Sequence, residues 1–117
     1  GDNRILVFNP RLMESDPEHA LLHVFSSNGE APVGVRLFAH GRMLAVANSN
    51  RFSDAPGSAE IFSLSESWDA TPFQTLAAGS FPRNITLSPD GRSLYLTNYT
   101  SRVLQVILTQ KLTAQKR

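Results

Sequence analysis

The chain has 117 residues, of which 41% are hydrophobic and 18% are charged, and its formal net charge at pH 7 is +1. This composition is typical of a folded protein rather than a disordered one. Acidic and basic residues are interspersed, so no basic surface of the kind that binds nucleic acid or anionic lipid is expected. The absence of cysteine excludes disulfides and thiolate metal sites, and no apolar run is long enough to span a membrane.

Nine short runs, rich in aliphatic, β-branched and aromatic residues and bounded by turn residues, predict β-strands and an all-β fold. Within the eighth run, Leu94, Leu96 and Asn98 alternate with Tyr95 and Thr97, which is typical of a strand between two unlike faces. Prolines limit any helix to a turn or so within residues 10–19 and 65–70. The predicted strands are, in chain order, Arg4–Phe8, Ala20–Phe25, Val33–Phe38, Met43–Asn48, Ala59–Leu64, Phe73–Ala77, Asn84–Ser88, Ser93–Asn98 and Arg102–Leu108.

The sequence also contains an internal repeat. Gly41 and Gly91 each precede an arginine in a tight connection between two predicted strands, where glycine accepts a positive φ. A period of fifty residues is slightly longer than the ~40–45 residues of a four-stranded propeller blade, and the loop at residues 49–58 accounts for the excess. The pairs separated by this period are Pro32 and Pro82, Gly41 and Gly91, Arg42 and Arg92, and Asn48 and Asn98.

The repeat and the strand count predict a β-propeller fragment of about two and a half four-stranded antiparallel blades. Residues 1–31 would hold the last two strands of one blade, residues 32–78 a complete blade, residues 79–110 three strands of a terminal blade, and residues 111–117 a basic C-terminal tail. Propellers close with roughly four to eight blades, and open blades expose strand edges and apolar faces. We therefore expect the remaining blades of a parent ring, or self-association, to complete the structure.

The segment LSPDGRSLYLTN, residues 87–98, closely resembles the YVTN-type β-propeller repeat, whose name-giving tetrad corresponds to Tyr95-Leu96-Thr97-Asn98. The copy at residues 37–64 is a weaker match with a longer loop. The resemblance implies a non-enzymatic binding or interaction scaffold, in a bacterial envelope or secreted setting, so it favours a periplasmic or extracellular location. The residues themselves leave the compartment open.

A related family of seven-bladed propellers contains sugar lactonases, in which a Pro-Arg-His segment enters the inner strand and an Asn-Glu pair ends the next. The matching positions here are Pro82-Arg83-Asn84 and Asn98-Tyr99. Asn84 and Tyr99 replace the histidine and the glutamate that the resemblance would place at an active-site mouth, which disfavours lactonase activity within this segment. No catalytic residue is predicted. A lactonase-like hydrolase acting on a sugar lactone and the propeller domain of a redox enzyme are kept as alternatives.

The candidate ligand-binding residues lie in loops that would share one face of the ring. Of these loops, residues 49–58 form an insertion with several polar groups, and long loops often carry function. Arg83 is able to hold an anion through the N–H donors of its planar guanidinium group. A protein or a carbohydrate is the expected ligand. The candidates are Asn50, Arg51, Asp54, Arg83, Asn84 and Tyr99.

No cofactor and no metal is predicted. His19, His23 and His40 show no metal-ligand spacing, and the sequence has no nucleophile elbow, phosphate-binding loop or dinucleotide fingerprint. Asn48 and Asn98 close equivalent strands and are expected to bond local backbone, which is a structural role.

Overall fold

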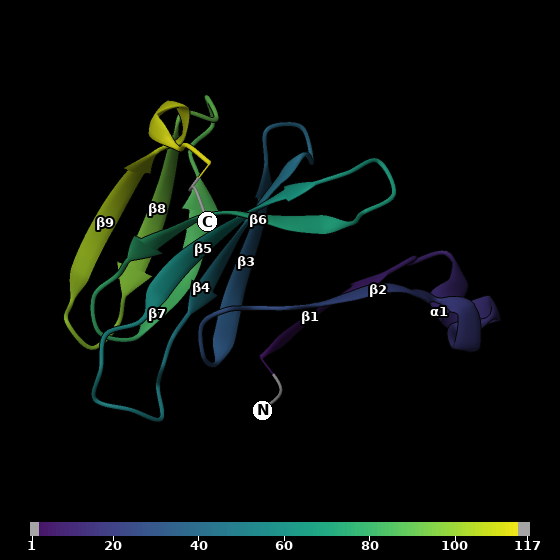
Figure 1. Cartoon of the computed structure of the whole chain (residues 1–117), viewed down its shortest axis with the longest axis horizontal. Coiled ribbons are helices and arrows are strands. Elements are labelled where there is room, and N and C mark those ends of the chain that lie inside the picture. The colour runs from purple at the N-terminus through teal and green to yellow at the C-terminus, as the bar shows by residue number, and fades with distance from the viewer. Residues whose placement is uncertain (1–2, 115–117) are drawn as a thin grey trace.

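The computed structural model describes residues 3–114, which form nine β-strands in three antiparallel sheets (Figure 1). The prediction of an all-β fold is confirmed, and the arrangement is consistent with an open, propeller-like fragment. The first sheet holds β1 (Arg4–Phe8) and β2 (Leu21–Ser26). The second holds β3 (Pro32–Phe38), β4 (Met43–Asn48), β5 (Ser58–Leu64) and β6 (Ala70–Ala77), and the third holds β7 (Pro82–Leu87), β8 (Ser93–Asn98) and β9 (Val103–Leu108).

Helical structure in the described residues is short. The predicted turn of helix after β1 is present as α1 (Leu12–Ser15) and a 3-10 turn, η1 (Pro17–His19), whereas residues 65–69 form a tight turn instead. A second 3-10 turn, η2 (Thr109–Lys111), was not predicted. No helix in the described part of the chain is long and apolar enough to cross a membrane.

The start of the predicted basic C-terminal tail packs against the rest of the chain. Leu112 packs against the main hydrophobic cluster, and the backbone N–H of Thr113 donates to Oε1 of Gln74 at 2.9 Å. The remainder of the predicted tail, residues 115–117, lies outside the described residues.

The central sheet β3–β6 has a neighbouring sheet packed on each face, although one face of β3 stays exposed. Ala45 and Ala47 of β4 pack with the third sheet, while Val46 packs with the first. In Figure 1 the β1–β2 hairpin extends from one side of the central sheet, and β8 and β9 lie on the opposite side. Because successive side chains on a strand point to opposite faces, β4 contributes to both interfaces. The larger interface buries Phe38, Ala45, Ala47, Ala59, Ile61, Ile85, Leu94, Leu96 and Ile107, and the smaller one buries Leu44, Val46 and Phe62.

The two Gly-Arg connections have the predicted geometry. Gly41 and Gly91 have φ values of +78° and +73°, a region that L side chains rarely adopt. In the second turn, the Ser88 hydroxyl donates to Oδ1 of Asp90 at 2.6 Å, and the Arg92 backbone N–H donates to the same oxygen at 3.0 Å. These hydrogen bonds favour the carboxylate and lower the pKa of Asp90 from its ordinary value of 3.8.

The fifty-residue repeat is visible in the backbone hydrogen bonds. The N–H of Ser49 donates to the Ala31 carbonyl at 2.9 Å, and the N–H of Tyr99 donates to the Phe81 carbonyl at 2.8 Å. Both acceptor residues have a positive φ, +53° for Ala31 and +59° for Phe81. The same unusual backbone conformation therefore recurs before β3 and before β7.

Candidate functional site

Four loops meet at one end of the sheets, which we call the loop end: residues 27–31, 49–57, 78–81 and 99–102. The Asn50 N–H donates to the Glu30 carbonyl at 3.0 Å, and the equivalent Thr100 N–H donates to the Ser80 carbonyl at 3.1 Å. The Gly57 N–H, from the long loop, reaches the Gly79 carbonyl at 3.1 Å. These hydrogen bonds hold the loops of the second and third sheets together.

Asn98 anchors the loop that enters the third sheet. Its Oδ1 accepts the Gly79 N–H at 2.9 Å, and its Nδ2 donates to the Val103 carbonyl at 3.3 Å. Gln105 on β9 adds a second contact, from Nε2 to the Ala77 carbonyl at 2.9 Å. The hydrogen bond to local backbone that was predicted for Asn98 is present, and the Asn98 side chain also holds the loop of residues 78–81 that leads into β7.

Asn48 and Glu60 occupy the equivalent positions in the second sheet. Glu60 is only 1% exposed, and its carboxylate accepts the Asn28 N–H at 2.9 Å and the Asn28 side-chain amide at 2.7 Å. The Ser27 hydroxyl lies 2.5 Å from Oδ1 of Asn48 and 3.1 Å from Oε1 of Glu60. The polar partners of this buried carboxylate within residues 3–114 come from the loop that leads into β3, which indicates a structural role.

A groove at the loop end, which we call the arginine groove, has a volume of about 780 Å³. The Arg83 guanidinium lies 5.4 Å from the centre of the Tyr99 ring, which in turn contacts the Phe81 ring edge-on at 5.7 Å. Tyr99 is 64% exposed, so its ring faces the open groove. The groove is lined by Val33, Arg51, Phe81, Arg83, Asn84 and Tyr99.

The arginine groove carries two positive charges, those of Arg51 and Arg83. Within residues 3–114, neither Arg51 nor Arg83 forms an ion pair with a carboxylate. Unpaired guanidinium groups keep five donors each available, in a planar arrangement that matches carboxylate and phosphate oxygens. The groove therefore has the charge and the donors to hold an anion.

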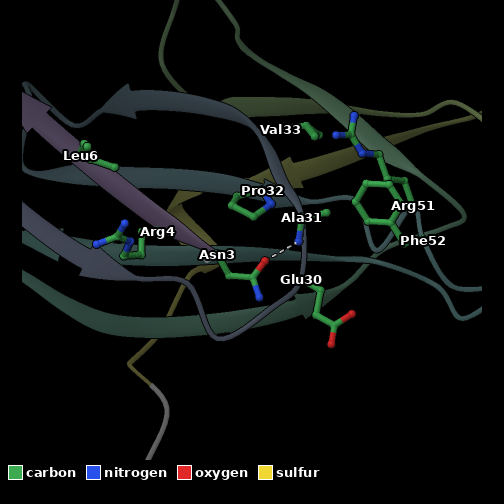
Figure 2. Close-up of a pocket in the computed structure, with 9 residues that line it drawn as sticks. All are labelled: Asn3, Arg4, Leu6, Glu30, Ala31, Pro32, Val33, Arg51 and Phe52. Atoms are coloured by element: carbon green, nitrogen blue, oxygen red, sulfur yellow. Dashed lines mark hydrogen bonds between the residues drawn. The ribbon is translucent and has the colours of Figure 1, made fainter. Parts of the chain in front are cut away.

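A second pocket adjoins the groove and shares Val33 and Arg51 with it (Figure 2). It has a volume of about 560 Å³, and the Arg51 guanidinium lies 4.8 Å from the centre of the Phe52 ring. Figure 2 shows these two side chains beside each other, and the Asn3 side chain accepting the Ala31 N–H at 2.9 Å. Arg51 thus lies where the two pockets meet.

The structure brings four of the six predicted ligand residues together in the arginine groove, namely Arg51, Arg83, Asn84 and Tyr99. Asn50 and Asp54 instead line a smaller neighbouring pocket of about 230 Å³, which Arg51 and Phe81 also reach. The Asn50 amide donates to the carbonyls of Ala55 and Pro56 at 3.3 Å, so it shapes its own loop.

Sequence reasoning missed two aromatic groups of these pockets, Phe52 and Phe81. Phe52 is 80% exposed in the long loop. A large aromatic residue within a loop rich in polar groups is a sequence signal that could have identified it as a pocket residue. Phe81 immediately precedes the Pro-Arg segment, and its place in the groove depends on its positive φ, which the residue type does not indicate.

The titratable groups in and around the groove include an arginine pair, a tyrosine and nearby acids. None of the six lining residues of the arginine groove has a carboxyl or imidazole group. The acidic residues that line the adjoining pockets are Asp54 and Glu30. Within residues 3–114, no three His, Asp or Glu side chains gather in a way that would hold a metal ion.

No protein-family model matches the chain, and no curated protein sequence matches it. Its fold is similar to the crystal structure of a candidate 6-phosphogluconolactonase from Bacteroides uniformis ATCC 8492, with a TM-score of 0.76 and 18% sequence identity. That neighbour has a lactonase-like fold related to propellers. The similarity covers 97% of this chain and 32% of that protein, so the chain spans about a third of its neighbour's length. At this identity the likeness concerns the fold alone, and the likeness to YVTN repeats remains a sequence resemblance.

Proposed function

We propose that the chain is part of a propeller-like scaffold that binds an anionic, sugar-like small molecule in the arginine groove without transforming it. The observation that carries this proposal is the meeting of Arg51 and Arg83 in one groove, with no carboxylate partner for either within the described residues. Further blades of a longer polypeptide would complete the ring. This part of the proposal is supported by the length of the structural neighbour, which is about three times that of this chain.

The remaining groove residues favour a carbohydrate over a simple ion. The Tyr99 and Phe81 rings offer apolar surface on which a sugar ring can stack, and the Asn84 amide offers both a donor and an acceptor for hydroxyl groups. A volume of about 780 Å³ falls within the range of roughly 300–1,000 Å³ that small-molecule sites occupy. An acidic or phosphorylated sugar satisfies both the charge and the shape.

The test is calorimetric titration of the full chain with D-gluconate, D-glucose 6-phosphate and neutral D-glucose. We expect the two anions to bind more tightly than glucose, and Arg51→Gln and Arg83→Gln each to weaken their binding about tenfold, which corresponds to roughly 1.4 kcal/mol. Arg42→Gln is the matched control, because Arg42 lies exposed in the turn between β3 and β4. Equal affinity for glucose, or unchanged affinity in both variants, would contradict the proposal.

Lactone hydrolysis is the second candidate, and the similarity to a candidate lactonase favours it. In such a reaction Arg83 would polarise the ester carbonyl, while the proton-transfer group would have to come from outside the arginine groove. The measurement is acid release from D-glucono-δ-lactone at constant pH, compared with the spontaneous rate. A rate above background that Arg83→Gln abolishes would favour the hydrolase over the binding scaffold.

A further inference from the structure

The loop of residues 27–31, which leads into β3, contains the single Asn-Gly dipeptide of the sequence, Asn28-Gly29. In such a dipeptide the backbone nitrogen that follows asparagine can attack the side-chain amide, because glycine has no side chain to hinder the approach. Asparagine is one of the thermolabile residues of proteins for this reason. Asn28 is therefore a candidate site of spontaneous covalent modification.

The packing of the loop requires glycine after Asn28. A Cβ on Gly29 would lie 2.5 Å from Cγ and 2.6 Å from Cβ of Asn48, distances that are too short for a side chain. Asn48 is 1% exposed, and its amide is held by the hydroxyl groups of Ser27 at 2.5 Å and Ser58 at 3.2 Å, so it has little room to move aside. The fold itself thus places glycine next to Asn28.

Glu60 and Ser27 bind both groups that would react. Nδ2 of Asn28 donates to Oε2 of Glu60 at 2.7 Å, and the Asn28 backbone N–H donates to Oε1 at 2.9 Å. The Gly29 N–H, whose nitrogen is the nucleophile, donates to the Ser27 hydroxyl at 3.1 Å. Ring closure requires the Asn28 side chain to turn and Gly29 to lose its amide proton, so these hydrogen bonds have to break first. Because hydrogen bonds to a charged acceptor are the stronger ones, Glu60 supplies most of this restraint.

The modified residue would conflict with the same carboxylate. Conversion of Asn28 to aspartate replaces the amide donor with a second carboxylate beside Oε2 of Glu60, whose side chain is buried. Two like charges at hydrogen-bond distance repel, and burial strengthens the repulsion. The loop of residues 27–31 would then lose its attachment to β5.

We propose that Asn28 is a deamidation site that Glu60 keeps unreactive in the folded chain, and that deamidation releases the loop of residues 27–31. In the reaction the Gly29 nitrogen gives up its proton and bonds to Cγ of Asn28, the bond from Cγ to Nδ2 breaks, and ammonia leaves with that proton. One water molecule then opens either C–N bond of the cyclic imide, which yields aspartate or isoaspartate at position 28. Asn28 is exposed, so water reaches the imide.

Two backbone hydrogen bonds report whether the loop stays in place. The N–H groups of Ser49 and Asn50 donate to carbonyls of this loop at 2.9 Å and 3.0 Å. Fifty positions later, the N–H groups of Tyr99 and Thr100 make the equivalent bonds to the loop of residues 78–81, at 2.8 Å and 3.1 Å. The internal repeat therefore provides a reference pair of amides within the same molecule.

The first test follows deamidation of the full chain at mildly alkaline pH by peptide mass spectrometry. We expect Asn28 to react more slowly by about tenfold or more in the folded chain than in urea, because modification follows the population of the opened loop. Glu60→Gln should accelerate the reaction of the folded chain about tenfold. Ile85→Ala is the matched control, because it destabilises the main hydrophobic cluster and leaves the contacts of Asn28 in place.

The second test measures amide hydrogen exchange in the variant Asn28→Asp, which carries the product of deamidation. Exchange at Ser49 and Asn50 should accelerate about tenfold or more, while exchange at Tyr99 and Thr100 should stay the same.

Equal reaction rates in the folded and unfolded chain would overturn the proposal, as would equal acceleration by Glu60→Gln and Ile85→Ala, which would assign the protection to global stability. Unchanged exchange at Ser49 and Asn50 in Asn28→Asp would overturn the release of the loop.

Discussion

The contact between the second and third sheets can be tested by truncating Ile85 and its repeat equivalent Val35. Ile85 is 1% exposed and packs on Ala45 and Ala47, so Ile85→Ala removes a buried side chain and leaves a cavity. Such substitutions cost about 2–5 kcal/mol. Val35 is 54% exposed, so Val35→Ala removes little buried surface and should cost no more than about 0.5 kcal/mol.

Urea denaturation, followed by circular dichroism, measures both free energies of unfolding. We expect the midpoint of Ile85→Ala to fall well below that of the parent chain, and the midpoint of Val35→Ala to stay close to it. In thermal unfolding, a loss of 3 kcal/mol corresponds to a shift of roughly 12 °C or more for a domain of this size. Equal losses in the two variants would refute the packing of the β3–β4 hairpin on β7.

Three further predictions concern the turn and the buried network. Gly91→Val should destabilise the chain by about 1–3 kcal/mol, because the φ of +73° is strained for a β-branched residue; an unchanged melting temperature would count against this turn. Glu60→Gln should lower the free energy of unfolding by about 1–3 kcal/mol, since the amide nitrogen cannot accept from Asn28, and urea denaturation at pH 7 checks this. The folded state lowers the pKa of Asp90, so the ionised form stabilises the turn above pH 3.8 and the contribution is lost as the pH falls below it. Asp90→Asn should therefore flatten the dependence of stability on pH in that acidic range, and an unaltered profile would exclude this role.

Strands and turns were predictable because they depend on local patterns. The alternation of Leu94 and Leu96 with Tyr95 placed the buried face correctly, and both leucines are fully buried. The period of fifty located Gly41 and Gly91 in equivalent turns, where glycine adopts a positive φ without the steric cost that other residues incur. The bounds of β1, β4 and β8 are as predicted, whereas the other strands differ by one to three residues at one or both ends, as at β6, which begins at Ala70 rather than Phe73.

The features that escaped prediction depend on contacts between distant segments. Glu60 is acidic and would ordinarily be exposed, but the Ser27–Asn28 segment surrounds it with donors. Leu112 packs against the main hydrophobic cluster, although it lies in the segment predicted to be a basic C-terminal tail. The convergence of Arg51 and Arg83, which are thirty-two residues apart, likewise depends on how the second and third sheets stack.

The most direct test of anion binding in the arginine groove is to follow the backbone amide resonances of the full chain by NMR while D-gluconate is added. The proposed function predicts saturable shifts concentrated at Arg51, Arg83, Asn84 and Tyr99, with much smaller shifts when D-glucose is added at the same concentrations. Shifts that are absent, or that fall on the opposite ends of the strands around Gly41 and Gly91, would contradict it.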